Sequence, residues 1–283
     1  MLLSVIITAS VVFILSIGYL TNTLKNKSLK DARELADAIA RENANLIRSS
    51  LNSEMGMAKS LANGFHDFRN ISEKDIEAVT KRTIYGVAVE NPDFLAVWAS
   101  WEVNSIDHTW NLPYGRYSYT YYNENGHLKY YKEPKNFDGD ILSSSYYMLK
   151  TTKKEALLDP YWYTYEGNNR LILETSACAP VLEGDRFAGV FGFDLELSRY
   201  QTLVKQIKPF KGCFAILLSQ NGTIIGHTND GFIGKSFDSI YPTENKKFDI
   251  LSKVYKGQSF SFLMTDKNTN EEYYATFVNI QIG

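Results

Sequence analysis

Cysteine is scarce in this sequence. Only Cys178 and Cys213 occur among 283 residues, and neither has a second cysteine or a histidine at the spacing that metal ligands need. This scarcity excludes a framework of several disulfides and argues against a zinc site. We expect both cysteines to be small core residues, since unpaired cysteine is among the most buried residue types. Their spacing leaves open whether they pair with each other.

A strong excess of one charge is also absent. The formal net charge is −2 and no long basic run occurs, so a nucleic-acid partner has little electrostatic support. The hydrophobic content of 44% is instead typical of a folded chain with a proper core. We therefore expect a globular protein that does not bind nucleic acid.

The motifs of the common enzyme classes are missing as well. The sequence has no G-x-S-x-G, no H-E-x-x-H, no P-loop and no glycine-rich dinucleotide fingerprint. We expect no enzymatic activity, no catalytic residue, no cofactor and no bound metal. The alternative is a glycoside hydrolase, which uses a pair of carboxyl groups. Its candidate acids are Asp159, Glu174 and Asp194, and no spacing among them selects a pair.

Charged residues are missing altogether from residues 2–20, LLSVIITASVVFILSIGYL. At about 1.5 Å per helical residue this run can cross the hydrocarbon core of a bilayer, so residues 1–20 are predicted to form a transmembrane helix. A cleaved signal peptide is the alternative, but the run is long for one and lacks a basic start and an A-x-A site. Lys25, Lys27 and Lys30 follow the run, which by the positive-inside rule places the rest of the chain in the cytoplasm.

Proline is absent from residues 21–62, and the only glycine there is Gly56. Apolar residues recur in this segment at helical spacing, at Leu35, Ile39, Leu46 and Ile47. The pattern predicts a long stalk helix that packs on a domain or pairs with a second copy. A second helix is predicted to start at Ser72, with Asp75 completing a capping box, and to end before Pro92.

After Pro92 the sequence changes to short β-forming runs separated by turn residues, which indicates an α+β protein. A short amphipathic helix ending near Pro209 separates two predicted domains, residues 63–204 and 205–283. The second ends without a polar tail, as a fragment of a longer chain would. Residues that favour positive φ predict three tight hairpins, at Asn125-Gly126, Glu183-Gly184-Asp185 and Asn221-Gly222. A last turn is expected at TDKNTN, residues 265–270.

Three stretches of this sequence resemble the extracytoplasmic double-Cache sensor region of bacterial receptors such as methyl-accepting chemotaxis proteins. They are ILSSSYYMLKTTKKEALLDPYWYTYEGN, APVLEGDRFAGVFGFDLELSRY and LSQNGTIIGHTNDGFIGKSF. The resemblance implies a long N-terminal helix followed by two PAS-like antiparallel-sheet modules, one membrane-distal and one membrane-proximal. It also implies a small ligand in the distal module and a homodimer through the long helix. Finally, it implies a sensor domain outside the cytoplasmic membrane, which is opposite to the orientation that the lysines after the apolar run predict.

The resemblance also implies which residues line the ligand pocket. The family's Pro-Tyr pair, upstream aromatic pair and G-x-D strand fall on Tyr161, on Tyr146 with Tyr147, and on Asp194. A carboxylate in the apolar run GVFGFDLEL is costly to bury alone, and a ligand ammonium would neutralise it. Neighbouring rings would add about 0.5–2 kcal/mol of cation–π attraction.

Tyrosines are concentrated in the same part of the chain, where eleven of the 19 lie between residues 117 and 165. Tyrosine offers a rigid face and a hydroxyl, which suits a pocket for a small polar ligand. In an extended run Tyr161, Tyr163 and Tyr165 would share one face and Trp162 the other. Further pocket candidates are Tyr119, Tyr121 and Trp98. The alternatives are hairpin packing for residues 117–131 and a structural hydrogen bond for Asp194.

Two departures from the family pattern argue against an α-amino acid as the ligand. Amino-acid-binding members have an arginine where this chain has Ser144, and an aspartate where it has Tyr163. Arg116 or Arg170 would have to supply the positive charge instead. The predicted function is the sensor domain of a transmembrane chemoreceptor, with a histidine kinase or a cyclic-nucleotide enzyme as alternative outputs. A pilin is disfavoured because residues 2–20 contain no glutamate.

Overall fold

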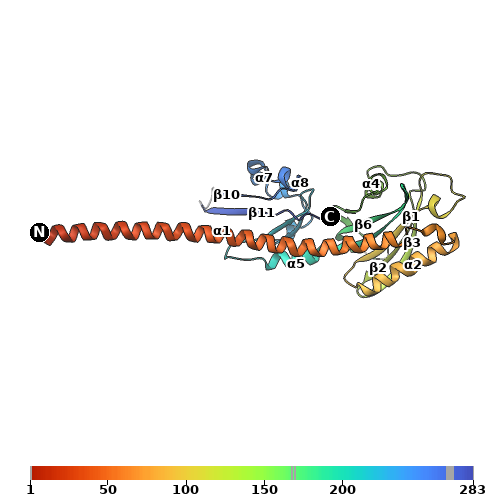
Figure 1. Cartoon of the computed structure of the whole chain (residues 1–283), viewed down its shortest axis with the longest axis horizontal. Helices are drawn as coiled ribbons and strands as arrows, with labels where there is room; N and C mark the ends of the chain where they lie inside the picture. The colour runs from red at the N-terminus through yellow and green to blue at the C-terminus, as the bar shows by residue number, and fades with distance from the viewer. Residues whose placement is uncertain (1, 167, 169, 266–270, 283) are drawn as a thin grey trace.

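We analysed a computed structural model that describes residues 2–166, 168, 170–265 and 271–282. Its first element is one continuous helix, α1 (Leu2–Gly64), which runs along the rest of the molecule (Figure 1). Residues 2–20 of the predicted span and the predicted segment 21–62 are therefore parts of one continuous helix. A buried stripe at helical spacing packs it on the domains, at Ala44, Ile47, Leu51, Glu54, Ala58 and Ala62.

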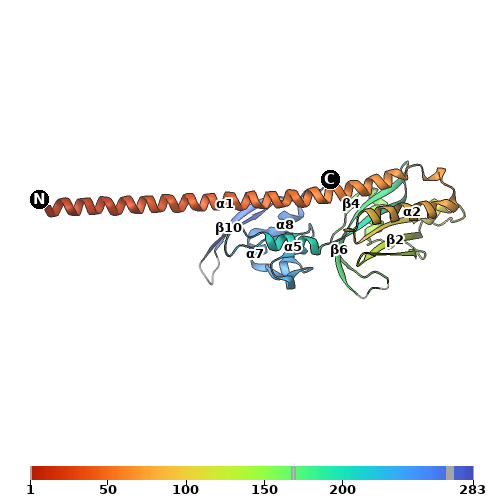
Figure 2. The same ribbon diagram turned by 90° about the horizontal axis from the view of Figure 1, so that it is seen from below.

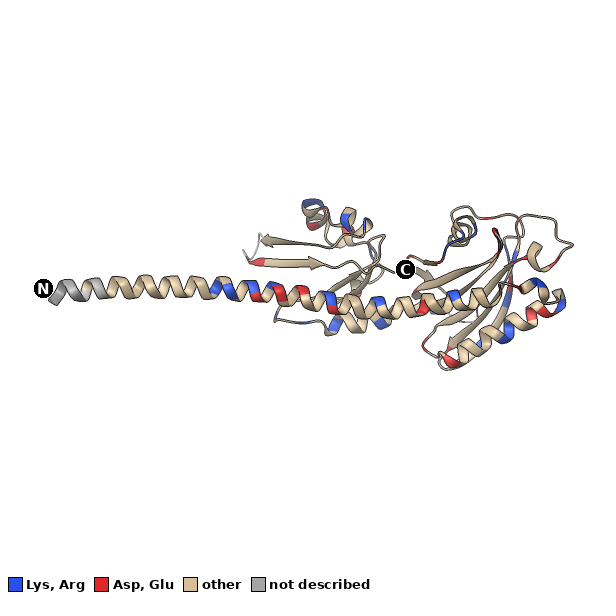
Figure 3. Cartoon of the chain, in the orientation of Figure 1, with Lys and Arg blue, Asp and Glu red and all other residues tan. Residues whose placement is uncertain are grey.

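The N-terminal part of α1 extends beyond both domains and carries no charged side chain where Figure 3 describes it. Large apolar residues there are well exposed, among them Phe13, Ile14 and Leu15 at 66%, 68% and 67%. No helix among the described residues meets the length and apolarity required of a membrane span. Residue 1 and the side chains of residues 2–6, 8 and 9, which belong to the predicted span, lie outside the described residues.

Two modules lie side by side along α1 (Figures 1 and 2). We name them by their distance from the N-terminal end of α1. The distal module contains a seven-stranded antiparallel sheet, with strand order β3-β2-β1-β7-β6-β4 and β5 paired to β6. Its strands are β1 (Ala96–Glu102), β2 (Arg116–Glu124), β3 (His127–Lys135), β4 (Ala156–Leu157), β5 (Tyr161–Tyr163), β6 (Ile172–Glu183) and β7 (Arg186–Glu196).

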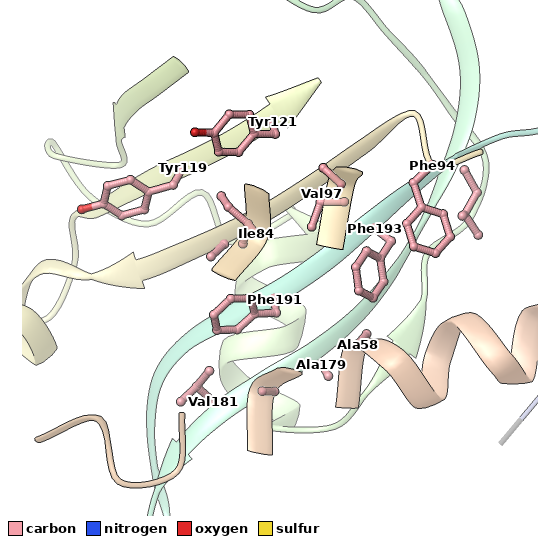
Figure 4. Packing of buried hydrophobic residues seen from close by; sticks show 14 of the residues in the cluster. Ala58, Ile84, Phe94, Val97, Tyr119, Tyr121, Ala179, Val181, Phe191 and Phe193 are labelled. Atoms are coloured by element: carbon pink, nitrogen blue, oxygen red, sulfur yellow. The ribbon is translucent and has the colours of Figure 1, made fainter. Parts of the chain in front are cut away.

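Helices α1 and α2 (Glu73–Glu90) cover one face of this sheet, and the main hydrophobic core lies between them and the strands (Figure 4). The ends of α2 agree with the prediction, since Ser72 is its N-cap and it stops before Pro92. The expected capping box is incomplete, however. The Ser72 hydroxyl donates to Asp75 at 2.6 Å instead of accepting a backbone N–H.

Shorter elements connect the strands of the distal module. A single turn, α3 (Val103–Ile106), follows β1, and the helix α4 (Ser145–Thr152) lies between β3 and β4. The predicted hairpin at Asn125-Gly126 is confirmed between β2 and β3, with φ of 53° and 86°. The hairpin at Gly184 joins β6 to β7, with φ of 55°.

The linker helix α5 (Ser198–Gln206) leads into the proximal module, as the sequence predicted. This module has two small sheets, β8 (Ile216–Leu218) with β9 (Ile224–His227), and β10 (Phe260–Thr265) with β11 (Glu272–Phe277). The hairpin at Asn221-Gly222 joins β8 to β9 as predicted. Most of the turn TDKNTN lies outside the described residues. The short helices α6 (Phe237–Ile240), α7 (Pro242–Phe248) and α8 (Ile250–Tyr255) lie between the sheets.

The two cysteines are free. Cys178 is fully buried in the distal module, as expected of a core residue. Cys213 is only half-buried, which differs from the prediction, because it lies in the loop between α5 and β8 and not in a strand.

Candidate functional site

The alternation of β-strand side chains divides the distal sheet into two faces. Val97 and Ala99 of β1 and Phe191 and Phe193 of β7 face the helices and belong to the main core. Trp98 of β1 and Asp194 of β7 point to the opposite face, where the Trp98 indole N–H donates to Asp194. The polar and aromatic side chains on this second face form the candidate site.

Asp194 is the centre of this site. It is 5% exposed, and its Oδ1 accepts hydrogen bonds of 2.7 Å from both Trp98 Nε1 and Ser176 Oγ. Its Oδ2 accepts one of 2.8 Å from the Tyr165 hydroxyl. Burial raises the pKa of Asp194, while the donors from Ser176, Trp98 and Tyr165 act in the opposite direction. No ion pair among the described residues includes this carboxyl group.

The spacing Gly192-x-Asp194 has a steric reason. Both residues are on the same face of β7, and Gly192 lies opposite Trp98 of β1. A Cβ at Gly192 would lie 2.2 Å from Cζ2 of Trp98. The glycine therefore leaves space for the indole ring, which can reach the carboxylate two residues further along β7.

Glu174 of β6 is a second carboxyl group in the site. It is 0% exposed, and its Oε2 lies 2.8 Å from the same Tyr165 hydroxyl that contacts Asp194. Its Oε1 has no hydrogen-bond partner among the described residues. Burial, followed by the neighbouring Asp194, raises the pKa of Glu174 to about 9. The site therefore holds two buried acids linked by one hydroxyl.

Tyrosines surround this pair of acids. The ring of Tyr165 stacks on that of Tyr122 with centroids 4.0 Å apart and lies edge to face with Tyr163 at 4.8 Å. Tyr163 in turn contacts Tyr161 at 6.2 Å, and the Tyr161 hydroxyl lies 2.6 Å from Ser176 Oγ. As the sequence predicted, Tyr161, Tyr163 and Tyr165 form one row. Burial raises the pKa of Tyr163 to about 12, so its hydroxyl remains a donor at neutral pH.

Tyr146 and Arg116 lie in a neighbouring polar cluster on the same face. The Arg116 guanidinium lies 4.0 Å from the ring centroid of Tyr146, whose hydroxyl donates to Glu102 at 2.7 Å. Lys150 donates to Glu102 at 2.9 Å and to Asp140 at 2.8 Å. Arg116 Nη1 donates to Ser100 Oγ at 2.8 Å. Burial lowers the pKa of Arg116, and Tyr146 together with the nearby carboxyl groups opposes that effect only in part.

This second cluster adjoins the Asp194 site and also opens to a hollow. Tyr146 belongs to an apolar group with Cys178 and Phe187, against which Trp98 packs. The adjoining hollow has a volume of about 540 Å³, and Glu102, Lys150, Lys153 and Phe187 are among its lining residues. Trp98 thus separates an acidic half of the site from a half that contains Arg116 and Lys150.

Other predicted site residues lie elsewhere. Tyr119 and Tyr121 are on the helix-covered face of the sheet (Figure 4). There the ring centroid of Tyr121 lies 5.2 Å from that of Tyr85 on α2. Tyr147 is half-buried on α4, and its backbone N–H donates to Ser144 Oγ. Ser144, at the position of the family's arginine, is therefore the N-cap of α4. Arg170 is paired with Glu196.

Four residues of the site were not among the predicted ligand-binding residues: Tyr122, Tyr165, Ser176 and Glu174. The sequence predicts a role for Glu174 only as a candidate acid of a glycosidase. The alternation of Glu174, Ser176 and Cys178 in LETSAC could have indicated a polar face on β6, because residues two apart share a face. Among the described residues, no group of three or more His, Cys, Asp or Glu side chains is arranged to hold a metal ion.

Comparisons with known structures identify the fold. The chain is similar to the extracellular domain of mmHK1S-Z2, a chain described as a histidine kinase, with a TM-score of 0.71, 21% identity, and coverage of 88% of this chain and 92% of that one. The periplasmic sensory domain of the Campylobacter jejuni chemoreceptor Tlp1 matches with a TM-score of 0.65, 17% identity, and coverage of 88% and 90%. The fold is that of extracytoplasmic sensor domains. The predicted resemblance is confirmed at this level.

A third similar structure contains a bound ligand. The ligand-binding domain of Mlp24 with asparagine has a TM-score of 0.53 and 17% identity, and the match covers 88% of this chain and 90% of that one. The sequence itself matches no protein-family model and no curated protein. The similarity is therefore one of three-dimensional structure.

Proposed function

We propose that this chain is the ligand-binding sensor domain of a bacterial transmembrane receptor, and that its ligand is a small molecule with a positively charged amine. The fold supports the sensor role, because structures similar to this chain over most of its length are sensor domains of a chemoreceptor and of a chain described as a histidine kinase. The site supports the choice of ligand class. The signal output can be chemotactic or that of a kinase, since both occur among these structures.

One observation supports an amine as the ligand. Two buried acids, Asp194 and Glu174, share one aromatic-walled site, and the described residues provide no ion-pair partner for either. A buried anionic group without a countercharge is costly, and a ligand ammonium would remove that cost. The ring faces of Tyr161, Tyr163 and Tyr165 would add cation–π attraction. The neighbouring Arg116 and Lys150 already contact acceptors of the protein, which makes a ligand carboxylate less favourable there.

The same geometry argues against the glycoside hydrolase alternative. A glycosidase needs the sugar between its two carboxyl groups. Here the Tyr165 hydroxyl occupies that space, 2.8 Å from each carboxyl group. Asp159, the third candidate acid, is exposed and lies outside this pair. We therefore propose binding without catalysis.

We further propose that the N-terminal end of α1 anchors the chain in the cytoplasmic membrane, with both modules on the extracytoplasmic side. The exposed apolar residues at this end need a lipid or protein environment. Further along α1, Leu24, Leu29, Leu35 and Leu46 are between 41% and 58% exposed, and they offer a surface for a second copy. A ligand would shift the equilibrium between two arrangements of the modules. The size of this shift is limited by the difference between the ligand's affinities for the two arrangements.

A thermal-shift screen of the chain in detergent micelles tests the ligand class. The screen compares amines with amino acids, organic acids, purines and sugars, since a ligand at 100 times its Kd adds about 2.7 kcal/mol of stability. We expect shifts with amines that are lost in Asp194→Asn and Tyr165→Phe. Tyr121→Phe is the matched control, because its hydroxyl lies on the helix-covered face. Shifts with acids or sugars alone would contradict an amine ligand.

A further inference from the structure

The Tyr165 hydroxyl is in contact with more acceptor oxygens than it has hydrogens to donate. It lies 2.8 Å from Glu174 Oε2 and 2.8 Å from Asp194 Oδ2. A hydroxyl has one hydrogen and so can donate to only one of two carboxylates. The other short contact is favourable only if that carboxyl group is protonated and donates to the tyrosine oxygen. The three side chains therefore share two protons: the hydroxyl proton of Tyr165 and one further proton on a carboxyl group.

The surrounding donors show which acid carries the extra proton. Asp194 accepts from Trp98 and Ser176 in addition to Tyr165, an arrangement that stabilises its ionised form. Because Ser176 uses its hydrogen toward Asp194, it must accept from Tyr161 in their 2.6 Å contact. Glu174 receives a hydrogen from neither Trp98 nor Ser176. The Tyr161 hydroxyl, which also lies near Glu174, gives its hydrogen to Ser176, and Glu174 Oε1 is buried without a hydrogen-bond partner among the described residues. The proton consequently lies on Glu174, which donates to Tyr165, and Tyr165 donates to Asp194.

The other charged and titratable groups near Glu174 do not replace this proton. From β7, Glu196 lies directly opposite Glu174 and is paired with Arg170. Of the remaining neighbours, Tyr161 on β5 and Tyr122 on β2 have their pKa values raised by burial and stay neutral, as do Tyr131 on β3 and Cys178 on β6. Lys135, at the end of β3, lowers the pKa of Asp194 less than the hydrogen bonds to this carboxyl group do. Burial and Asp194 together raise the pKa of Glu174 to about 9, in agreement with the hydrogen-bond geometry.

We propose that the Glu174–Tyr165–Asp194 chain stores one proton in the unliganded protein and releases it when a cationic ligand binds. The inference rests on the proposed function for the place and charge of the ligand. In the binding step the Glu174 O–H bond breaks and its proton passes to solvent. The ligand ammonium keeps its own protons and takes over the countercharge, and Tyr165 keeps its hydrogen. Glu174 is then the residue that makes recognition of a cation dependent on pH.

Titration calorimetry tests the release of the proton directly. The chain in detergent micelles is titrated with butylamine and with 1,4-diaminobutane at about pH 7.5, in buffers of different ionisation enthalpy. The dependence of the measured heat on the buffer gives the number of protons exchanged. We expect about one proton released per amine bound by the natural chain and none by Glu174→Gln. Glu196→Gln is the matched control and should still release the proton, because Glu196 is already paired with Arg170.

The dependence of affinity on pH gives a second readout. Below the pKa of Glu174, the affinity of the natural chain should rise by up to about tenfold per pH unit, since each bound amine displaces one proton. The affinity of Glu174→Gln should change little over the same range. Binding of either amine without proton release would overturn this inference and leave the proposed function standing. If neither amine bound, both the proposed proton release and the proposed amine ligand would be wrong.

Carbon-13 NMR of the side-chain carboxyl groups examines the proton without any ligand. In the unliganded chain we expect one glutamate carboxyl group to remain protonated at neutral pH. The carbon signal of this group should be missing from the spectrum of Glu174→Gln. If Glu174 were ionised at neutral pH, the inference would be wrong whatever ligand binds. This measurement separates the stored proton from the identity of the ligand.

Discussion

Trp162 and Gly234 are in contact although they belong to different modules. A Cβ at Gly234 would lie 2.7 Å from Cζ2 of Trp162, so the indole of β5 rests directly on the backbone of the proximal module. The neighbours of Trp162 on β5, Tyr161 and Tyr163, belong to the row of rings at the acid pair. One short strand thus touches the candidate site with one face and the second module with the other. A ligand that moves β5 would change this contact.

A double-mutant cycle between these two residues measures the contact. Gly234 has φ of +76°, so Gly234→Ala combines a backbone cost of about 1–2 kcal/mol with a clash against the ring. We expect Gly234→Ala to lower the free energy of unfolding by at least about 1 kcal/mol less in a Trp162→Ala background than in the natural chain. Urea unfolding provides the values.

Gly212→Ala is the control for this cycle. Gly212 has φ of +84°, but a Cβ there would meet no atom within 4 Å. Its cost should be the backbone cost alone and the same in both backgrounds. An equal cost of Gly234→Ala with and without Trp162 would show that the two modules are not coupled through this contact.

The steric role of Gly192 leads to a second prediction. In Gly192→Ala the new Cβ would lie 2.2 Å from Trp98, so the indole must move and its hydrogen bond to Asp194 is lost. We expect amine affinity to fall by at least about tenfold, since a hydrogen bond to a charged group contributes about 1.5–3 kcal/mol. Calorimetry gives the affinity, and tryptophan fluorescence reports the displaced ring.

Two further variants make this prediction specific. Trp98→Phe keeps a ring above Gly192 but lacks the N–H, and it should weaken binding in the same direction. Gly86→Ala on α2 has open space around its Cβ and should leave binding unchanged. Normal affinity in Gly192→Ala would mean that Trp98 does not orient Asp194.

Local sequence signals predicted those parts of the fold that depend on neighbouring residues. The long α1, the end of α2 before Pro92, and the hairpins at Gly126 and Gly184 all follow from helix periodicity or from residues that favour positive φ. These features need no knowledge of distant contacts. For the same reason, the sequence could indicate the short amphipathic helix α5, which ends before Pro209.

The faces of β2 were harder to predict because they depend on pairing between strands. Tyr117, Tyr119 and Tyr121 alternate with Ser118, Thr120 and Tyr122, and the sequence cannot show which set the helices cover. In the structure Tyr121 pairs with Val97 of β1, which faces the core, and it therefore lies away from Asp194. The alternate residue Tyr122 reaches the site by stacking on Tyr165. The link between Glu174 and Asp194 likewise depends on the pairing of β6 with β7.

The buried acid Glu174 predicts how stability depends on pH. Its pKa in the folded protein, about 9, is above its value in the unfolded chain, so folding favours the protonated form. This contribution is complete below the unfolded pKa and is lost as pH rises toward 9. The unfolding free energy of the natural chain should therefore fall relative to that of Glu174→Gln by up to about 1.4 kcal/mol per pH unit. Urea unfolding at about pH 5, 6.5 and 8 is the measurement.

The matched control for this pH dependence is Glu196→Gln. Glu196 is partly exposed and paired with Arg170, so its removal should leave the slope of the natural chain nearly unchanged. A constant difference between the natural chain and Glu174→Gln at all three pH values would contradict a protonated Glu174.

The ion pair of Glu54 and Arg199 predicts how α5 is held against α1. Glu54 lies in the buried stripe of α1, and its Oε1 accepts from Arg199 Nη2 of α5 at 2.6 Å. Arg199→Ala leaves the buried carboxylate without its partner, and we expect a loss of about 3 kcal/mol, the low end for such pairs because the Arg199 side chain is 32% exposed. Adding Glu54→Gln should recover part of this loss, because a neutral amide is cheaper to bury than an unpaired charge.

Lys59→Ala is the control, since its pair with Glu155 is exposed and should contribute less than about 1 kcal/mol. Similar losses in Arg199→Ala and Lys59→Ala would show that the Glu54 pair does not fix the linker helix to the stalk.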